Sequence, residues 1–235
     1  MKKKTFSSEL AYIIGLIMLS LGSSLIEKAS FGMSMVVSPA YLLHIKISPI
    51  FDFFTFGMAE YCFQGLLIII LSLILKSFHF SYLFSFVTAV LYGFLLDGWM
   101  FVVSHFPDGA IMGRILWFAV GISFTTFGIS ALFNTYISPE AYELFVKNVS
   151  EKFSYPLFKV KYAYDLCSLI LSIALSLIFF ASFKGIGIGT VVTALLNGKL
   201  IAMWTGSLNK HFVFEDKLKL RKYFEKQQIH ERCTT

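Results

Sequence analysis

Charged residues are scarce in this sequence. Asp, Glu, Lys and Arg make up 14 % of its 235 residues, against about 25 % in an average soluble domain. Hydrophobic residues make up 57 % and aromatic residues 17 %, which is more apolar surface than a soluble core of this length can bury. The composition therefore excludes an ordinary soluble protein and predicts an all-α integral membrane protein.

Cysteine and histidine are also few. The chain has three cysteines, an odd number, and Cys62 and Cys167 fall in apolar stretches, so a disulfide framework is not expected. The five histidines are scattered without the spacing of metal ligands, and the nucleophile motif typical of hydrolases is missing. We therefore expect no metal, no cofactor and no enzymatic activity.

What the sequence does contain is long apolar runs. Six of them approach the length of about 20 residues that crosses a bilayer. They lie near residues 8–27, 57–75, 80–103, 113–134, 160–182 and 187–207. The first run lacks a signal-peptide cleavage site of small residues and is interpreted as a retained helix. Residues 1–207 are thus predicted to form a single membrane domain, followed by a basic cytoplasmic tail at 208–235.

The positions of Lys and Arg predict the orientation. If the amino terminus is cytoplasmic, the basic residues on the outside are only Lys28, Lys46, Arg114 and Lys184. By the positive-inside rule both termini are therefore cytoplasmic. Because topology and the tail account for the net charge of +6, no nucleic-acid partner is expected.

The two halves of the membrane domain resemble each other. TAVLYGFLLDGW at 88–99 aligns without a gap with TALLNGKLIAMW at 193–204, and Ser-Pro at 38–39 has a counterpart at 138–139. Three spans per half is an odd number, so the second half would enter the membrane from the opposite side. We therefore predict two inverted-topology three-helix repeats, about 8–103 and 113–207, as in many secondary transporters.

The connections after the first span of each half differ in polarity. Residues 28–56 are too apolar for a solvated loop, and a short or re-entrant helix is expected because backbone at membrane depth must line protein or water. The second connection, SPEAYELFVKNVSEKF, is more polar. Ser138 reads as an N-cap followed by Pro139 and Glu140 in the first turn, and this segment is interpreted as a surface helix.

Three blocks of the sequence are considered together: ASFGMS at 29–34 followed by Ser38-Pro39, GIGIGTVVTALLNG at 185–198, and Asp97 four residues after Gly93. Together they resemble the YczE/YitT group of bacterial membrane proteins. The resemblance covers about residues 10–207 and implies a multi-pass protein of the bacterial cytoplasmic (inner) membrane. That group has no settled biochemical activity, so the resemblance bears on the fold and leaves the function open.

Ionisable residues inside spans are costly and are therefore functional candidates. Four occur: Glu60, Asp97, Asp165 and Lys199. Asp97 and Lys199 fall on similar faces of equivalent spans, which predicts that they meet directly or through a ligand; the alternative is a structural ion pair. Glu60 and Asp165, at the starts of equivalent spans, are candidates for gating or coupling, although acids near helix N-termini are also favoured by the helix dipole.

Further candidates surround these four. Glycine-rich turns can present backbone N–H groups to an anion, and the third span of each half and the first connection carry polar side chains. The additional predicted solute-binding residues are Tyr92, Asn197, Gly187, Gly189, Thr190 and Ser38.

The sequence thus predicts a secondary transporter that moves a small, anionic or zwitterionic solute by alternating access, with Lys199 at the negative group. The alternative is a substrate-binding or accessory subunit without transport of its own. The expected partners are the lipid bilayer and a small-molecule solute, and both a homodimer and a partner subunit are compatible with the sequence.

Overall fold

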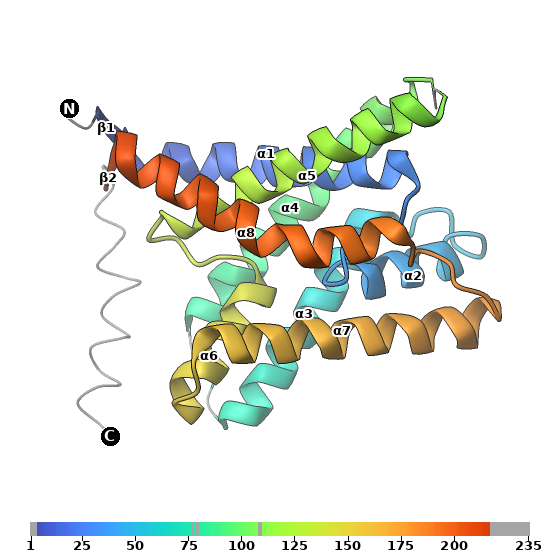
Figure 1. Cartoon of the computed structure of the whole chain (residues 1–235). Coiled ribbons are helices and arrows are strands. Elements are labelled where there is room, and N and C mark those ends of the chain that lie inside the picture. The colour runs from blue at the N-terminus through green and yellow to red at the C-terminus, as the bar shows by residue number, and fades with distance from the viewer. Residues whose placement is uncertain (1–3, 77, 79, 108–109, 217–235) are drawn as a thin grey trace.

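The computed structural model describes residues 4–216 except 77, 79 and 108–109. The described chain is almost entirely helical (Figure 1). Its elements are β1 (Lys4–Ser7), α1 (Ser8–Ala29), α2 (Ser38–Ile47), α3 (Phe56–Leu75), α4 (Phe80–Ser104), α5 (Ile111–Phe133), α6 (Ala141–Phe153), α7 (Leu157–Phe180), α8 (Ile188–His211) and β2 (Phe212–Glu215).

Six of the helices are long and apolar enough to cross a membrane, namely α1, α3, α4, α5, α7 and α8. Large apolar side chains cover their outer surface: Leu73 is 71 % exposed and Ile178 75 % exposed. Such exposure is stable in hydrocarbon and not in water. The predicted multi-pass helical membrane protein is confirmed at this level, and the predicted spans match these helices to within a few residues.

Both connections contain a short helix. In the first, Ser38 and Pro39 begin α2, where the missing N–H of proline costs nothing. In the second, α6 begins at Ala141 with Glu140 as its N-cap, so the prediction of Ser138 as the cap is wrong. The helix expected in this segment is present, and one side of it is buried against α3 and α7.

The centre of the fold is the pair α1 and α5. Glycines let their backbones approach closely: a Cβ on Gly128 would lie 2.7 Å from the carbonyl oxygen of Gly15, and a Cβ on Gly22 equally close to that of Gly121. This pairing makes the two helices antiparallel. Helix α4 packs on α1, and α8 packs on α5 (Figure 1).

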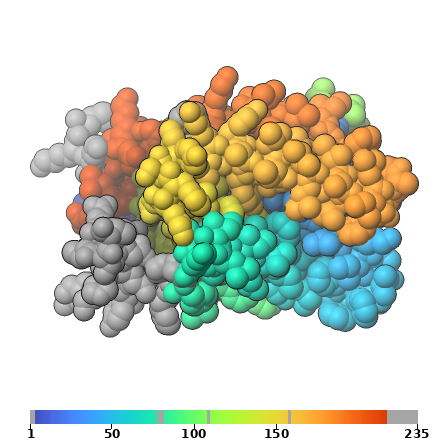
Figure 2. Space-filling view, turned by 90° about the horizontal axis from the view of Figure 1, so that it is seen from below, coloured from blue at the N-terminus to red at the C-terminus, as the bar shows by residue number. Residues whose placement is uncertain are grey.

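The remaining helices form a second group. Helix α3 packs along α4 and also contacts α2 and α6, while α7 contacts α2 and α6. Figure 2 shows α6 and α7, in yellow and orange, on the face of the molecule that also carries the segment around residue 50 in blue. Helices α7 and α8 have at most marginal contact with each other.

The two ends of the membrane domain meet in a small sheet. Strands β1 and β2 pair in parallel, with Lys4 opposite Phe212 and Ser7 opposite Glu215, beside the start of α1 and the end of α8 (Figure 1). Both ends therefore lie on the same side of the helical domain. The greater part of the predicted basic tail, residues 217–235, lies outside the described residues.

Candidate functional site

A cavity of about 200 Å³ lies between the two groups of helices. We call it the central cavity. Its walls come from α1, α4, α5, α7 and α8 and from both connections, and they are mostly apolar. The polar or charged side chains among its lining residues include Ser34, Tyr92, Glu140, Tyr142, Glu143, Lys161, Asp165 and Asn197.

Two buried glutamates share one hydrogen-bond donor beside this cavity. The Nε2 of Gln64 lies 3.5 Å from an oxygen of Glu60 and 3.3 Å from an oxygen of Glu140. The backbone N–H of Ala141 donates to Oε1 of Gln64 at 3.1 Å, which fixes the amide so that its nitrogen faces both carboxyl groups. We call Glu60 and Glu140 the carboxylate pair.

The local sequence explains how this pair forms. Glu60 and Gln64 are one helical turn apart on α3 and therefore share a face. The α6 N-terminus lies on that face, because Ser85 and Thr88 of α4 donate hydrogen bonds to the carbonyls of Pro139 and Ser138. Glu140 is carried into the interior by this anchored turn.

The carboxylate pair is short of partners. Glu60 is 0 % exposed and Glu140 7 % exposed, and Tyr142 donates to Glu60 at 2.8 Å. Among the residues that the structure describes, one oxygen of each carboxyl group has no hydrogen-bond partner. Burial raises the pKa of Glu140 well above its usual range, and the nearby charge of Glu60 adds to this effect.

A separate ionic cluster faces the same cavity. The ammonium of Lys161 lies 3.0 Å from Glu143 and 3.5 Å from Asp165. Lys161 and Asp165 are on α7, whereas Glu143 is on α6, so the cluster joins the two helices. We call these three residues the Lys161 cluster; two acids surround one base, and its net charge is negative when all three are ionised.

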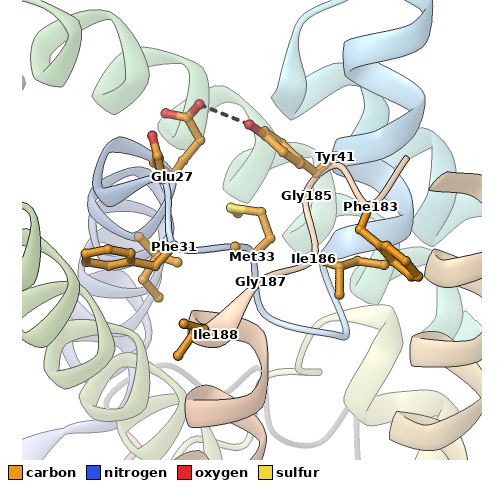
Figure 3. A pocket seen from close by; sticks show the side chains of 12 residues that line it. Glu27, Phe31, Met33, Tyr41, Phe183, Gly185, Ile186, Gly187 and Ile188 are labelled. Carbon is orange, nitrogen blue, oxygen red and sulfur yellow. Dashed lines mark hydrogen bonds between the residues drawn. The ribbon is translucent and has the colours of Figure 1, made fainter. Parts of the chain in front are cut away.

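A second pocket of about 410 Å³ opens at the C-terminal end of α1, between residues 26–33 and 183–188 (Figure 3). Figure 3 shows Tyr41 pointing toward Glu27 across its rim, with a hydrogen bond of 3.3 Å between them. Burial raises the pKa of Tyr41 first, and the charge of Glu27 raises it further. Tyr41 therefore stays protonated and donates to the carboxylate.

The predicted anion site at the glycine-rich turn is not free to bind an anion. The N–H of Gly189 donates to the carbonyl of Phe31 at 2.7 Å, and the N–H of Gly187 donates to the hydroxyl of Thr190 at 3.2 Å. Gly32 has φ +105°, and a Cβ there would lie 2.5 Å from the nitrogen of Gly187. These glycines thus serve close packing of the two turns.

Asp97 and Lys199 do not meet in the structure. Asp97 accepts hydrogen bonds from the Thr55 hydroxyl at 2.6 Å and from the backbone N–H of Gly57 at 2.8 Å. Lys199 is exposed on α8 and has no ion pair with Asp97 in the described part of the chain. The predicted direct contact is therefore absent, because Asp97 is turned toward the start of α3.

The other predicted residues lie in three different settings. Tyr92, Asn197 and Asp165 line the central cavity, and Tyr92 donates to the hydroxyl of Ser23 at 2.8 Å. Ser38 is fully buried, and its hydroxyl has no partner within the described residues. Glu60 belongs to the carboxylate pair, so its place at the start of a span reflects more than the helix dipole.

Several residues of the site were missed in the sequence. Glu140 was assigned to the first turn of a helix, and Lys161 to the topology signal. Glu143 carried no signal, and Gln64 was overlooked. The one available clue was the spacing of Glu60 and Gln64, which places two polar side chains on one face of an apolar helix.

Comparison with known proteins places this sequence in a family. A family model described as "Family of unknown function (DUF6198)" matches residues 6–206. The chain belongs to the DUF6198 family. It is also similar to "Uncharacterized protein YyaS" of Bacillus subtilis (strain 168), at 26 % identity over 211 residues, covering 88 % of this chain and 96 % of that protein.

These matches support the resemblance to a bacterial membrane protein family only in part. The family shown is DUF6198, and nothing in the comparisons supports the YczE/YitT name specifically. No solved structure matches the chain.

Proposed function

We propose that this DUF6198 protein is a secondary transporter that binds a small solute in the central cavity and moves it by alternating access. The observation that carries the proposal is the cavity itself. Charged side chains of α6 and α7 line a mostly apolar space between helices of the membrane domain. Charge at such a place is costly and is by default a candidate for function.

The helix packing supports two inverted repeats as part of this proposal. Each half has the order long helix, short helix, long helix, long helix. Helix contacts also come in matched pairs. Within the halves, the contact of α1 with α4 corresponds to that of α5 with α8, and between the halves, the contact of α2 with α7 corresponds to that of α6 with α3. Such a construction allows one half to rock against the other around a fixed site.

The charges of the cavity favour a solute with a cationic group, including a zwitterion. Glu140, Glu143 and Asp165 face the cavity with Lys161, so acids outnumber bases. The expectation of an anion rested on Lys199, which is exposed and does not belong to the lining residues described. We therefore retain the zwitterion and replace the anion with a cation.

We further propose that the protein resides in the bacterial inner membrane with both termini in the cytoplasm and has no enzymatic activity. The parallel pairing of β1 with β2 supports a shared side for the two ends, and the basic residues support the cytoplasmic side. The alternative is a substrate-binding subunit, which would have the same cavity but would not transport the solute, so a transport assay distinguishes the two. Both a homodimer and a complex with a partner subunit are compatible with this cavity.

The test has two stages. The purified protein is screened for thermal stabilisation by cationic, zwitterionic and anionic metabolites, since a ligand of the folded state stabilises it by RT ln(1 + [L]/Kd). We expect a cationic or zwitterionic hit that Asp165→Asn weakens and Lys199→Met leaves unchanged. The hit is then tested for uptake into proteoliposomes; binding without uptake would favour the binding subunit, and a hit lost in Lys199→Met alone would contradict the site.

A further inference from the structure

The two carboxyl groups of the carboxylate pair are too close and too buried for both to be ionised at low cost. Two carboxyl groups lie within hydrogen-bond reach of one amide nitrogen, and both are buried. If both were ionised, two negative charges would share a space of low dielectric with no positive charge bonded to either.

Among the described residues, no basic side chain is bonded to the carboxylate pair. The titratable and charged groups that face the pair or its side of the cavity are Tyr12 from α1, Tyr92 from α4, Tyr142 and Glu143 from α6, and Lys161, Tyr164 and Asp165 from α7. Helix α2 meets this region through Ala40. Lys161 is the basic member of this set, and it forms ion pairs with Glu143 and Asp165 instead.

The described residues do not form a metal site that could neutralise the pair. Among the described residues, no group of three or more His, Cys, Asp or Glu side chains is placed to hold a metal. The hydrogen bonds from Gln64 and Tyr142 also occupy one oxygen of each carboxyl group. What remains is a free oxygen on Glu60 and another on Glu140.

We infer that Glu60 and Glu140 form a proton-binding site that holds one exchangeable proton and opens to the central cavity through Glu140. Glu140 lines the cavity, whereas Glu60 lies behind it on α3. On release, the O–H bond of the carboxylic acid breaks, the proton passes to water or to a basic group in the cavity, and the carboxylate keeps the electron pair.

This site also names the coupling ion of the proposed transport, a step that rests on the proposed function. A proton and a cationic group of the solute cannot both neutralise Glu140 at once. Competition between them would link solute binding to proton release, which is what exchange across a membrane requires. The proton-binding site does not depend on solute binding and can be tested separately.

The test is infrared spectroscopy of the intact protein in detergent, using protons and deuterons as the probes. We expect the wild type to show a protonated carboxyl C=O band at neutral pH that shifts in D2O and disappears on alkaline titration. The band should be lost in Glu140→Gln and in Glu60→Gln. It should persist in Glu143→Gln, a matched change three residues away on α6 in a carboxylate paired with Lys161.

The outcomes are distinct. A wild-type protein without this band at neutral pH, or a band that both Glu60→Gln and Glu140→Gln leave intact, would overturn the inference. If a variant fails to fold, the alkaline titration of the wild type still decides whether a carboxyl group is protonated, and the remaining variant assigns it. A band assigned to the pair in a protein that moves no solute would uphold the proton site and contradict the transport proposal.

Discussion

Gly22 of α1 lies directly against Gly121 of α5. A Cβ added to Gly22 would be 2.7 Å from the carbonyl oxygen of Gly121 and 2.5 Å from the backbone nitrogen of Thr125. Both are main-chain atoms of a rigid helix, so neither can turn aside. The contact fixes the distance between the two central helices of the membrane domain.

Gly22→Ala is therefore expected to destabilise the protein by about 1–3 kcal/mol, the usual cost of overpacking. Gly98→Ala is the matched control, because nothing lies within 4 Å of a Cβ there and alanine is the better helix former by about 1 kcal/mol. Thermal unfolding in detergent measures both. Equal behaviour of the two variants would contradict close backbone packing at Gly22.

Asp97 and Lys199 are expected to act independently. Asp97→Ala removes the acceptor of two hydrogen bonds near the start of α3 and should cost about 1–3 kcal/mol. Lys199→Met should have little effect on stability, since Lys199 is exposed. Their double variant should show the sum of the two effects; a coupling energy of 1 kcal/mol or more would indicate a contact that the structure lacks.

The stability of the fold should fall as pH rises above about 5. The raised pKa of Glu140 means that the folded protein keeps a proton that the unfolded chain loses near its ordinary pKa of about 4.3. Between the unfolded and folded pKa values, each pH unit should cost up to about 1.4 kcal/mol for this one proton. Below both values the contribution is complete, and above the folded pKa no more is lost.

Glu140→Gln should flatten this pH dependence, while Glu143→Gln should keep it. Thermal midpoints across a pH series measure the slope for the three proteins. A wild-type slope that is absent in this window, or that survives unchanged in Glu140→Gln, would show that Glu140 does not carry the proton.

Water should reach the central cavity from one side of the membrane in a given state. The experiment uses a chain in which the three native cysteines are replaced. A cysteine introduced by Asn197→Cys, at a position that lines the cavity, should react with a membrane-impermeant maleimide. The reagent reacts with the thiolate, and a thiol ionises only where water reaches it. Leu195→Cys, two residues away and 69 % exposed on the outer surface, should remain unlabelled in proteoliposomes because lipid surrounds it. The reverse pattern would place the cavity residue in lipid.

Long spans follow from local composition, and for that reason the sequence predicted the membrane helices and the short α2. The site depends on packing between distant segments. Glu140 is buried only because α6 lies on α3 and its entry is anchored to α4, and no spacing within the second connection reveals that. The polar character of α6 instead indicated a surface position.

Lys199 and Lys161 show the same limit from opposite directions. A lysine in the middle of an apolar run is a functional candidate because a charge inside the membrane costs free energy. Lys199 nevertheless faces outward on α8. Lys161 lies at the start of a span, where lysine is common, yet it bonds two acids at the cavity. Whether each lysine faces the cavity or the outer surface depends on its direction around the helix axis. That direction is set by the packing of neighbouring helices, which the sequence alone does not reveal.

Helix α7 is held in a different manner from the other spans. It packs on the short helices α2 and α6 and has at most marginal contact with its sequence neighbour α8. Swinging α7 away from α8 would therefore break few contacts, while the Lys161 cluster would tie α6 to the movement. If the central cavity binds a solute as proposed, opening of the seam between α7 and α8 would give that solute a direct route between the bilayer and the cavity.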